Sequence, residues 1–491
     1  MSEGLSPKKI VPIVYVIAMF MAAMDATIVN VALRTISGEM QVTPSAASVV
    51  NVGYLLSLSV LLPVSGWLGD RFGSKRIFAL ALLLFTGASA LCGLAGSLTS
   101  LTWFRVLQGA GGGLMTPTGM AMLFRTFPPQ ERAALSRYLV LPIALAPALG
   151  PIIGGLFTSE LSWRWGFYIN VPLGVAALLL CGLFVREHRE PDAGRLDVRG
   201  LLLAAPGFAL LVYALHEGGA YGWSSPLTAA AGACGALLLA ALVVHALRVP
   251  KPLLDLRLLA VGSYRTSGIV AALAAAGLLG LLYVFPLMYQ DVMHASALEA
   301  GLITFPEALG LMAASQLMPR SYKRLGPRNL IAWALAGTAV IFTALGLIDP
   351  AVSPWALRAL LFGVGLLLGH AVGAVQLAAF AELPPPAMGR ATTLYTVQNR
   401  LGGALGLALL ASLLGAVGGG GADGVYAPVA YRVALLGAAG LLVAALGFAL
   451  RLRAAAEAGA ARGPAAGAPA AAARPASAGT AGGAGAASSE G

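Results

Sequence analysis

Among the few charged residues inside long apolar runs, three could do chemistry: Asp25, Arg105 and Glu307. Burial disfavours the charged form of a carboxyl group, so such an acid can take up a proton and release it when its surroundings change. An arginine at membrane depth is costly and normally faces a partner acid or a polar cavity. The three residues therefore indicate a candidate site for proton coupling or substrate binding.

Each of the three also has a structural explanation. Asp25 could hydrogen-bond a neighbouring helix, and the long side chain of Arg105 could reach the membrane surface. Glu307 could lie near a helix start at the outer interface. If Glu307 instead faces a central cavity, it would favour cationic compounds.

A glycine-containing basic segment, 66–76, forms a second candidate site. Small residues allow two helices to approach closely. Its one acid is predicted to have a specific partner, either a basic residue of the same segment or the N-terminus of another helix. Such a contact could close the cytoplasmic side, although the segment could also be an ordinary basic loop. The candidate gate residues are Gly66, Asp70, Arg71, Gly73 and Arg76.

Prolines and several glycines interrupt the apolar run 136–158. Proline removes a backbone hydrogen bond and glycine permits bending, so this helix is predicted to be kinked. It could be a close-packed hinge or only a bent helix. The residues of this motif are Gly150, Pro151, Gly154 and Gly155.

The elements that carry these motifs are predicted to be membrane helices. Of the 491 residues, 58% are hydrophobic and 10% are charged, against about 25% charged residues in soluble domains. A membrane span needs about 20 mainly apolar residues, and backbone groups in lipid must be satisfied within a helix. The sequence predicts an all-α protein with fourteen transmembrane helices, near 11–33, 48–68, 77–96, 102–124, 136–158, 166–185, 199–216, 226–247, 266–289, 299–318, 329–347, 356–379, 391–416 and 431–450.

The helices are predicted to form two six-helix bundles with two extra helices between them. Repeated halves with a site between them are common in secondary transporters. The Ala, Gly, Pro and Ser composition of the C-terminal tail is typical of disorder. The predicted divisions are a cytoplasmic N-terminus at 1–10, an N-terminal bundle at 11–185, a cytoplasmic linker with two extra helices at 186–265, a C-terminal bundle at 266–453 and a tail at 454–491.

The net charge of +11 reflects topology. Most lysines and arginines fall in alternate loops, as the positive-inside rule describes, which places both termini in the cytoplasm and excludes a nucleic-acid footprint. The three cysteines lie in predicted helices without metal-ligand spacing. No nucleophile with a base partner and no complete nucleotide-binding loop is found in the sequence, so an enzyme is not expected.

The motifs together resemble the major facilitator superfamily, and in particular its fourteen-helix branch of drug:proton antiporters. The resemblance covers about 11–450 and is carried by the stretches 25–33, 66–76, 105–113, 146–155, 163–174 and 398–403. Three positions depart from the usual family pattern: Arg34 replaces a proline, Ser74 replaces a basic residue, and Ala146 replaces a glycine.

The resemblance implies a multidrug efflux permease of the cytoplasmic (inner) membrane, driven by inward proton flow. Asp25 would be the coupling or substrate-sensing acid, Arg105 would modulate proton release, and Asp70 would belong to the cytoplasmic gate. Export of one endogenous metabolite, or facilitated movement without proton coupling, stays open. The predicted partners are a small-molecule substrate, protons and the lipid bilayer, for a monomer with no cofactor, no metal and no nucleic acid.

Overall fold

The computed structural model describes most of the chain as helix, and the described residues contain no strand. The predicted tail 454–491 and most of the predicted span 136–158 lie outside the described residues. The described residues are 7–42, 47, 49–128, 131–132, 135, 138, 146, 149–150, 153–154, 156–190, 193–221, 223–295, 297–347, 352–418 and 426–452.

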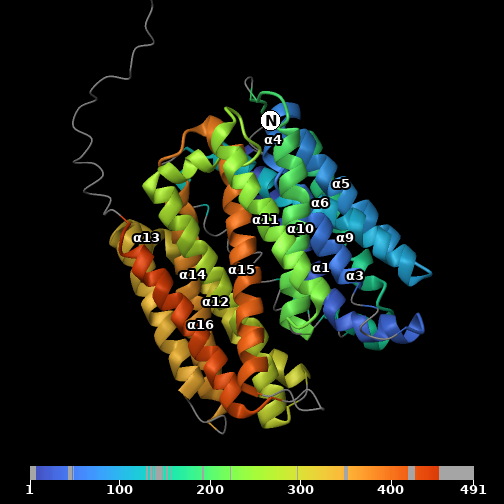
Figure 1. Cartoon of the computed structure of the whole chain (residues 1–491), viewed down its shortest axis with the longest axis vertical. Coiled ribbons are helices and arrows are strands. Elements are labelled where there is room, and N and C mark those ends of the chain that lie inside the picture. The colour runs from blue at the N-terminus through green and yellow to red at the C-terminus, as the bar shows by residue number, and fades with distance from the viewer. Residues whose placement is uncertain are drawn as a thin grey trace, which may run out of the picture.

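The helices of the N-terminal part lie together on one side of the molecule, drawn from blue to teal in Figure 1. They are α1 (Pro7–Glu39), α3 (Val49–Leu61), α4 (Ser65–Phe72), α5 (Ser74–Gly93), α6 (Leu98–Thr126), the π-helical turn η2 (Phe157–Leu161), α8 (Trp165–Tyr168) and α9 (Asn170–Phe184).

The helices of the C-terminal part lie together on the other side, drawn from yellow to red in Figure 1. They are α12 (Gly262–Met293), α13 (Ala297–Leu347), α14 (Pro354–Ala379), α15 (Met388–Gly418) and α16 (Pro428–Ala449), with the short 3₁₀ turns η3 (Leu256–Ala260) and η4 (Pro385–Ala387).

Two further helices, α10 (Val198–Tyr221) and α11 (Pro226–Arg248), pack against one another beside both groups. They are drawn in green in Figure 1. Helix α10 contacts α3 of the N-terminal group and α15 of the C-terminal group, so this pair lies along the boundary between the two groups.

The all-α membrane fold is confirmed. Within the described part of the chain, ten helices are long and apolar enough to cross a membrane, and α3 with α4 forms one further span bent by 52°. Two further segments add to this count of spans. They are helix α6, which has 29 residues, and the predicted span 136–158. These features are compatible with the predicted count of fourteen.

Helix α13 accounts for two of the predicted spans. A straight helix of its 51 residues would be about 77 Å long, whereas the hydrocarbon core of a membrane is about 30 Å thick. The helix breaks at Gly326, whose φ of 73° lies in the left-handed region that glycine adopts without strain. The glycine therefore separates the segments predicted at 299–318 and 329–347.

The segment 66–76 is more regular than the loop that its composition indicated, so the expectation of a loop there is wrong. Residues Ser65–Phe72 are helical, α5 begins at Ser74, and the one residue between the two helices is Gly73, with a φ of 109°. A glycine is needed at that position because side chains disfavour this backbone conformation.

Glycines of α6 bring its backbone against α3. A β-carbon added at Gly113 would lie 2.5 Å from the backbone oxygen of Leu58. Neither backbone can relax this contact by a side-chain rotation, so the packing of the two helices requires a residue without a side chain.

We expect Gly113→Ala to lower the thermal stability of the purified protein, because overpacking of this kind costs about 1–3 kcal/mol. Gly87→Ala on α5 is the matched control, since a β-carbon there meets no atom within 4 Å. The measurement is the midpoint of thermal unfolding in detergent. Equal midpoints for the two variants would contradict the packing argument.

Candidate functional site

Asp25 of α1 and Arg105 of α6 form an ion pair inside the N-terminal group of helices. The guanidinium Nη1 of Arg105 lies 2.5 Å from Oδ2 of Asp25, and the two side chains are 1% and 0% exposed. The pair excludes one alternative, because a buried Arg105 does not extend to the membrane surface. The two most unusual charges of the N-terminal half therefore stabilise one another.

Gln108 completes this pair into a network. Its Nε2 donates to Oδ1 of Asp25 at 2.9 Å, and its Oε1 accepts from Nη1 of Arg105 at 2.7 Å. The same amide donates to Ser89 of α5 at 2.6 Å, and Asn170 of α9 donates to the same hydroxyl at 3.3 Å. Four helices thus hold one buried polar cluster, which orients both carboxylate oxygens of Asp25.

Aromatic rings cover the cluster. The guanidinium carbon of Arg105 lies 4.2 Å from the ring centroid of Tyr54 on α3 and 5.8 Å from that of Phe167 on α8. A cation over an aromatic face is attracted by the negative charge of the ring face. Arg105 is therefore held by a carboxylate, an amide and two rings.

The two buried charges of the cluster depend on one another. The mutual attraction of two buried charges offsets their desolvation only while both are present. A proton on Asp25 would leave the Arg105 charge without its counter-ion, and within the described residues Nε of Arg105 already has no hydrogen-bond partner.

Asp70 pairs with a residue that the sequence did not indicate. Its Oδ1 lies 2.7 Å from Nη2 of Arg125 at the end of α6, and both side chains are 7% exposed. Nη1 of Arg125 also donates to Ser74 at 2.7 Å. The expected basic partners Arg71 and Arg76 are therefore wrong for Asp70. The third expected partner of Asp70 was the N-terminus of another helix. This agrees with the position of the Asp70 carboxylate beside Gly389, in the first turn of α15.

Helices α4 and α15 approach closely at this end of the molecule, and we call this region the α4–α15 contact (Ser65–Phe72 with Met388–Thr393). A β-carbon added at Gly66 would lie 2.5 Å from Oγ1 of Thr393 and 2.6 Å from the backbone oxygen of Gly389. The hydroxyls of Ser65 and Thr393 are 3.3 Å apart. The two halves are thus closed against one another here.

A second bond between the halves lies nearby. Nη1 of Arg132, which is 6% exposed, donates to the backbone oxygen of Phe380 after α14 at 2.9 Å. Its guanidinium carbon also lies 5.7 Å from the ring centroid of Phe124. Together with the α4–α15 contact, this bond closes the same end of the molecule.

The remaining gate candidates lie at the surface of this end, next to the linker after α9. Glu187 accepts from the backbone nitrogens of Lys75 and Arg76 at 3.0 and 3.2 Å and lies 3.7 Å from Nε of Arg76. Its carboxylate therefore caps the start of α5. The backbone of Glu190 donates to that of Asp70 at 3.0 Å, so the linker is fixed to α4.

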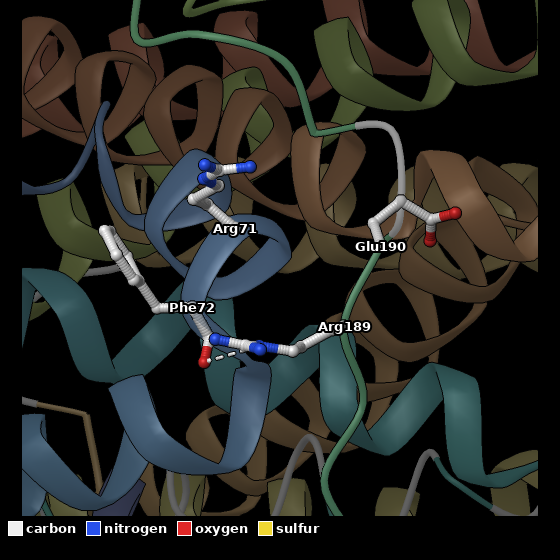
Figure 2. A pocket seen from close by; sticks show the side chains of 4 residues that line it. All are labelled: Arg71, Phe72, Arg189 and Glu190. Atoms are coloured by element: carbon white, nitrogen blue, oxygen red, sulfur yellow. Dashed lines mark hydrogen bonds between the residues drawn. The ribbon is translucent and has the colours of Figure 1, made fainter.

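A surface hollow of about 340 Å³ lies between this linker and α4. Figure 2 shows the four residues that line it: Arg71, Phe72, Arg189 and Glu190. Arg189 points toward α4, where its Nε donates to the backbone oxygen of Phe72 at 3.2 Å. Arg71 therefore lies beside the linker and not in the buried pair.

Glu307 lies apart from the Asp25 cluster, in the C-terminal group. It is 5% exposed on α13, and Oε1 of its carboxyl group has no hydrogen-bond partner among the described residues. Its backbone oxygen packs against Gly365 of α14. The structure thus places Glu307 in the protein interior, and its effect on cation selectivity stays a prediction.

The helix-five motif is only partly described. Gly150 packs against Thr27 of α1, and Gly154 is buried. Pro151 and Gly155 lie outside the described residues, so the predicted kink stays a prediction.

The stretch 163–174 fixes the far end of α1. Nε1 of Trp163 donates to Oε2 of Glu39 at 2.6 Å, and Nη1 of Arg164 lies 2.8 Å from Oε1 of the same carboxylate. The hydrogen bond from Trp163 is the main reason that the pKa of Glu39 lies below its ordinary value, with a further contribution from Arg164. This clamp ties α1 to the segment before α8.

Sequence reasoning missed several partners of the predicted site residues. Gln108 follows Arg105 by three residues, a spacing that places both on one helix face, and this signal was available. Arg125 and Glu187 had no comparable signal. Each contacts a partner that lies more than fifty residues away in the sequence.

We expect Asp70→Asn and Arg125→Gln each to lower thermal stability, because removal of one member of a buried ion pair costs about 3–5 kcal/mol. The double variant should recover part of the loss, since it leaves no unpaired charge. Lys8→Gln is the control, because Lys8 and Glu131 form a surface pair that is 50% and 45% exposed and such pairs contribute little. Additive losses in the double variant would show that the pair is not coupled.

Comparison with known proteins agrees with this architecture. Residues 15–407 match the family model described as Major Facilitator Superfamily. The chain is 33% identical over 408 residues to the multidrug resistance protein B homolog of Mycobacterium tuberculosis, an alignment that covers 82% of this chain and 75% of the relative. It is 31% identical over 396 residues to the putative multidrug resistance protein MdtD of Serratia proteamaculans, covering 81% and 83%.

Solved structures show the same fold at low sequence identity. The human organic anion transporter MFSD10 superposes with a TM-score of 0.64 at 15% identity, covering 91% of this chain and all of that one. The proton:xylose symporter XylE gives a TM-score of 0.63 at 15% identity, covering 89% and 94%. The chain is therefore a multi-pass membrane transporter that belongs to the major facilitator superfamily.

Proposed function

We propose that this transporter is a proton-coupled antiporter that exports drugs or other small organic molecules across the cytoplasmic membrane. The observation that carries the proposal is the buried Asp25–Arg105–Gln108 cluster. A carboxylate of this kind changes its interaction energy strongly with protonation, which is the property that coupling to a proton gradient requires. The multidrug-resistance names of the relatives support drugs as the cargo.

The closed end of the molecule supports alternating access. In this mechanism the two halves rock around a site between them, near the middle of the membrane. The α4–α15 contact and the bond from Arg132 to Phe380 hold the halves together at one end. With both termini in the cytoplasm, as the basic loops predict, this end is the cytoplasmic one, and the structure corresponds to a state closed to the cytoplasm.

In the proposed cycle, Asp25 takes up a proton from outside. Loss of the Asp25 charge releases Arg105 from its counter-ion, and the helices that share the cluster, α1, α5, α6 and α9, rearrange. Because α6 also carries Arg125, the rearrangement can reach the partner of Asp70 and open the α4–α15 contact. The chain acts as a monomer, with protons and the exported molecule as its ligands.

We expect Asp25→Asn to abolish proton-driven transport, because an amide cannot exchange a proton at this position. Purified wild type and variant are reconstituted in liposomes with an imposed pH gradient, and uptake of ethidium is followed. Asp291→Asn is the control for the loss of an acid, since this carboxylate pairs with Tyr431 in the other half of the molecule.

Each outcome of this experiment has a definite meaning. Movement of ethidium in wild type that Asp25→Asn abolishes supports the antiporter. Gradient-driven movement of ethidium that is equal in wild type and Asp25→Asn would show that Asp25 does not couple transport to protons. Exchange without any dependence on the pH gradient, measured by counterflow, would instead show a facilitator.

We also expect Glu307→Gln to weaken transport of cationic compounds, because the substitution removes the buried acid of the C-terminal half. The measurement is the KM for ethidium compared with that for an uncharged dye in the same liposomes. A selective rise in the KM for ethidium is the expected result. Unchanged transport of cations would disprove a role for Glu307 in selectivity.

A further inference from the structure

The motif at 398–403 on α15 contains an arginine that the proposed cycle does not use. Arg400 lies near the middle of the candidate span Pro385–Val417. A charge at this depth is costly unless it faces a partner or an open polar space. Its side chain is exposed, and among the described residues no hydrogen bond or ion pair engages its guanidinium.

The register of α15 shows which way Arg400 faces. With 3.6 residues per turn, Arg400 lies within roughly 20° of both Gly389 and Thr393 around the helix. Those two residues form the C-terminal side of the α4–α15 contact. Arg400 is therefore on the side of α15 that faces the N-terminal half, about 10 Å further into the membrane than Thr393.

The opposite side of α15 is occupied by another helix. Gly402 and Gly406 pack against Ala272 and Ala276 of α12, and both glycines lie more than about 100° from Arg400 around the helix axis. Arg400 thus points away from its own half of the molecule and toward the boundary between the halves.

Two tyrosines of the N-terminal half lie across from Arg400. Tyr15 of α1 and Tyr54 of α3 are near enough to Arg400 to interact with its charge, and both side chains are buried, at 5% and 4% exposure. Tyr54 is also the ring under the guanidinium of Arg105. Arg400 therefore faces the tyrosines that lie between the Asp25 cluster and the boundary of the two halves.

We propose that Arg400 binds an anionic group of the transported molecule, at a site between the halves. The ligand class is an organic anion with an aromatic or apolar scaffold, for example an aromatic carboxylate. A guanidinium presents paired donors that match a carboxylate, and such charge-assisted bonds are strong where water is scarce. This inference rests on the proposed function in one respect, which is that the chain transports small organic molecules.

The test compares three ligands that share one scaffold: 1-naphthoate, 1-naphthamide and 1-naphthylmethylammonium. Their binding to purified protein in nanodiscs is measured by titration calorimetry for wild type, Arg400→Gln and Arg400→Lys. We expect Arg400→Gln to raise the Kd of naphthoate by about tenfold or more. The Kd of naphthamide should change little, and the ammonium compound should bind as well or better. Arg400→Lys should give an intermediate Kd for naphthoate, since a lysine keeps the charge without the paired donors.

Arg265→Gln is the matched control for loss of one positive charge, because Arg265 is exposed at the start of α12. It should leave all three Kd values unchanged. Thermal midpoints confirm that each variant is folded.

Three results would overturn the proposal. They are the absence of naphthoate binding to wild type, an equal Kd of naphthoate in wild type and Arg400→Gln, and an equal loss of binding for all three ligands. The titration uses no proton gradient, so its result is independent of the coupling experiment on Asp25. The substrate class and the proton coupling can therefore fail separately.

Discussion

The ion pair between Asp25 and Arg105 is the constraint around which the N-terminal half is built. Two charges buried in a membrane protein are tolerated only when their groups are mutually satisfied. Gln108, Ser89 and Asn170 supply the remaining hydrogen bonds. Because these residues come from α1, α5, α6 and α9, the relative positions of four helices depend on one cluster.

Close helix packing makes this cluster rigid. Helix association in lipid depends on contact between backbones, since apolar side chains gain little from leaving lipid. Gly113 places α6 against α3, which carries the ring of Tyr54 that covers Arg105. At the other end of α6, Arg125 holds Asp70 beside the first turn of α15. A single helix therefore connects the buried pair with the contact between the halves.

The two halves contribute different chemistry to the boundary between them. The N-terminal half holds the paired acid Asp25 in its interior, where the ring of Tyr54 covers its partner Arg105. The C-terminal half supplies Arg400, which is exposed on the side of α15 that faces the N-terminal half. Under the proposed mechanism, the proton and the exported molecule thus have separate sites, with Tyr15 and Tyr54 between them. Binding at one site can then influence binding at the other as the halves move.

The sequence by itself determined the helical membrane fold, because twenty-residue apolar runs and alternating basic loops have few other solutions. It also identified Asp25, Arg105 and Asp70 as residues that need partners, since buried or misplaced charge is costly wherever it occurs. Only the tertiary structure decided who those partners are. Asp70 meets Arg125 rather than Arg71 or Arg76, and Arg400 lies on the side of α15 that faces the other half, because partner choice depends on how helices distant in sequence pack together.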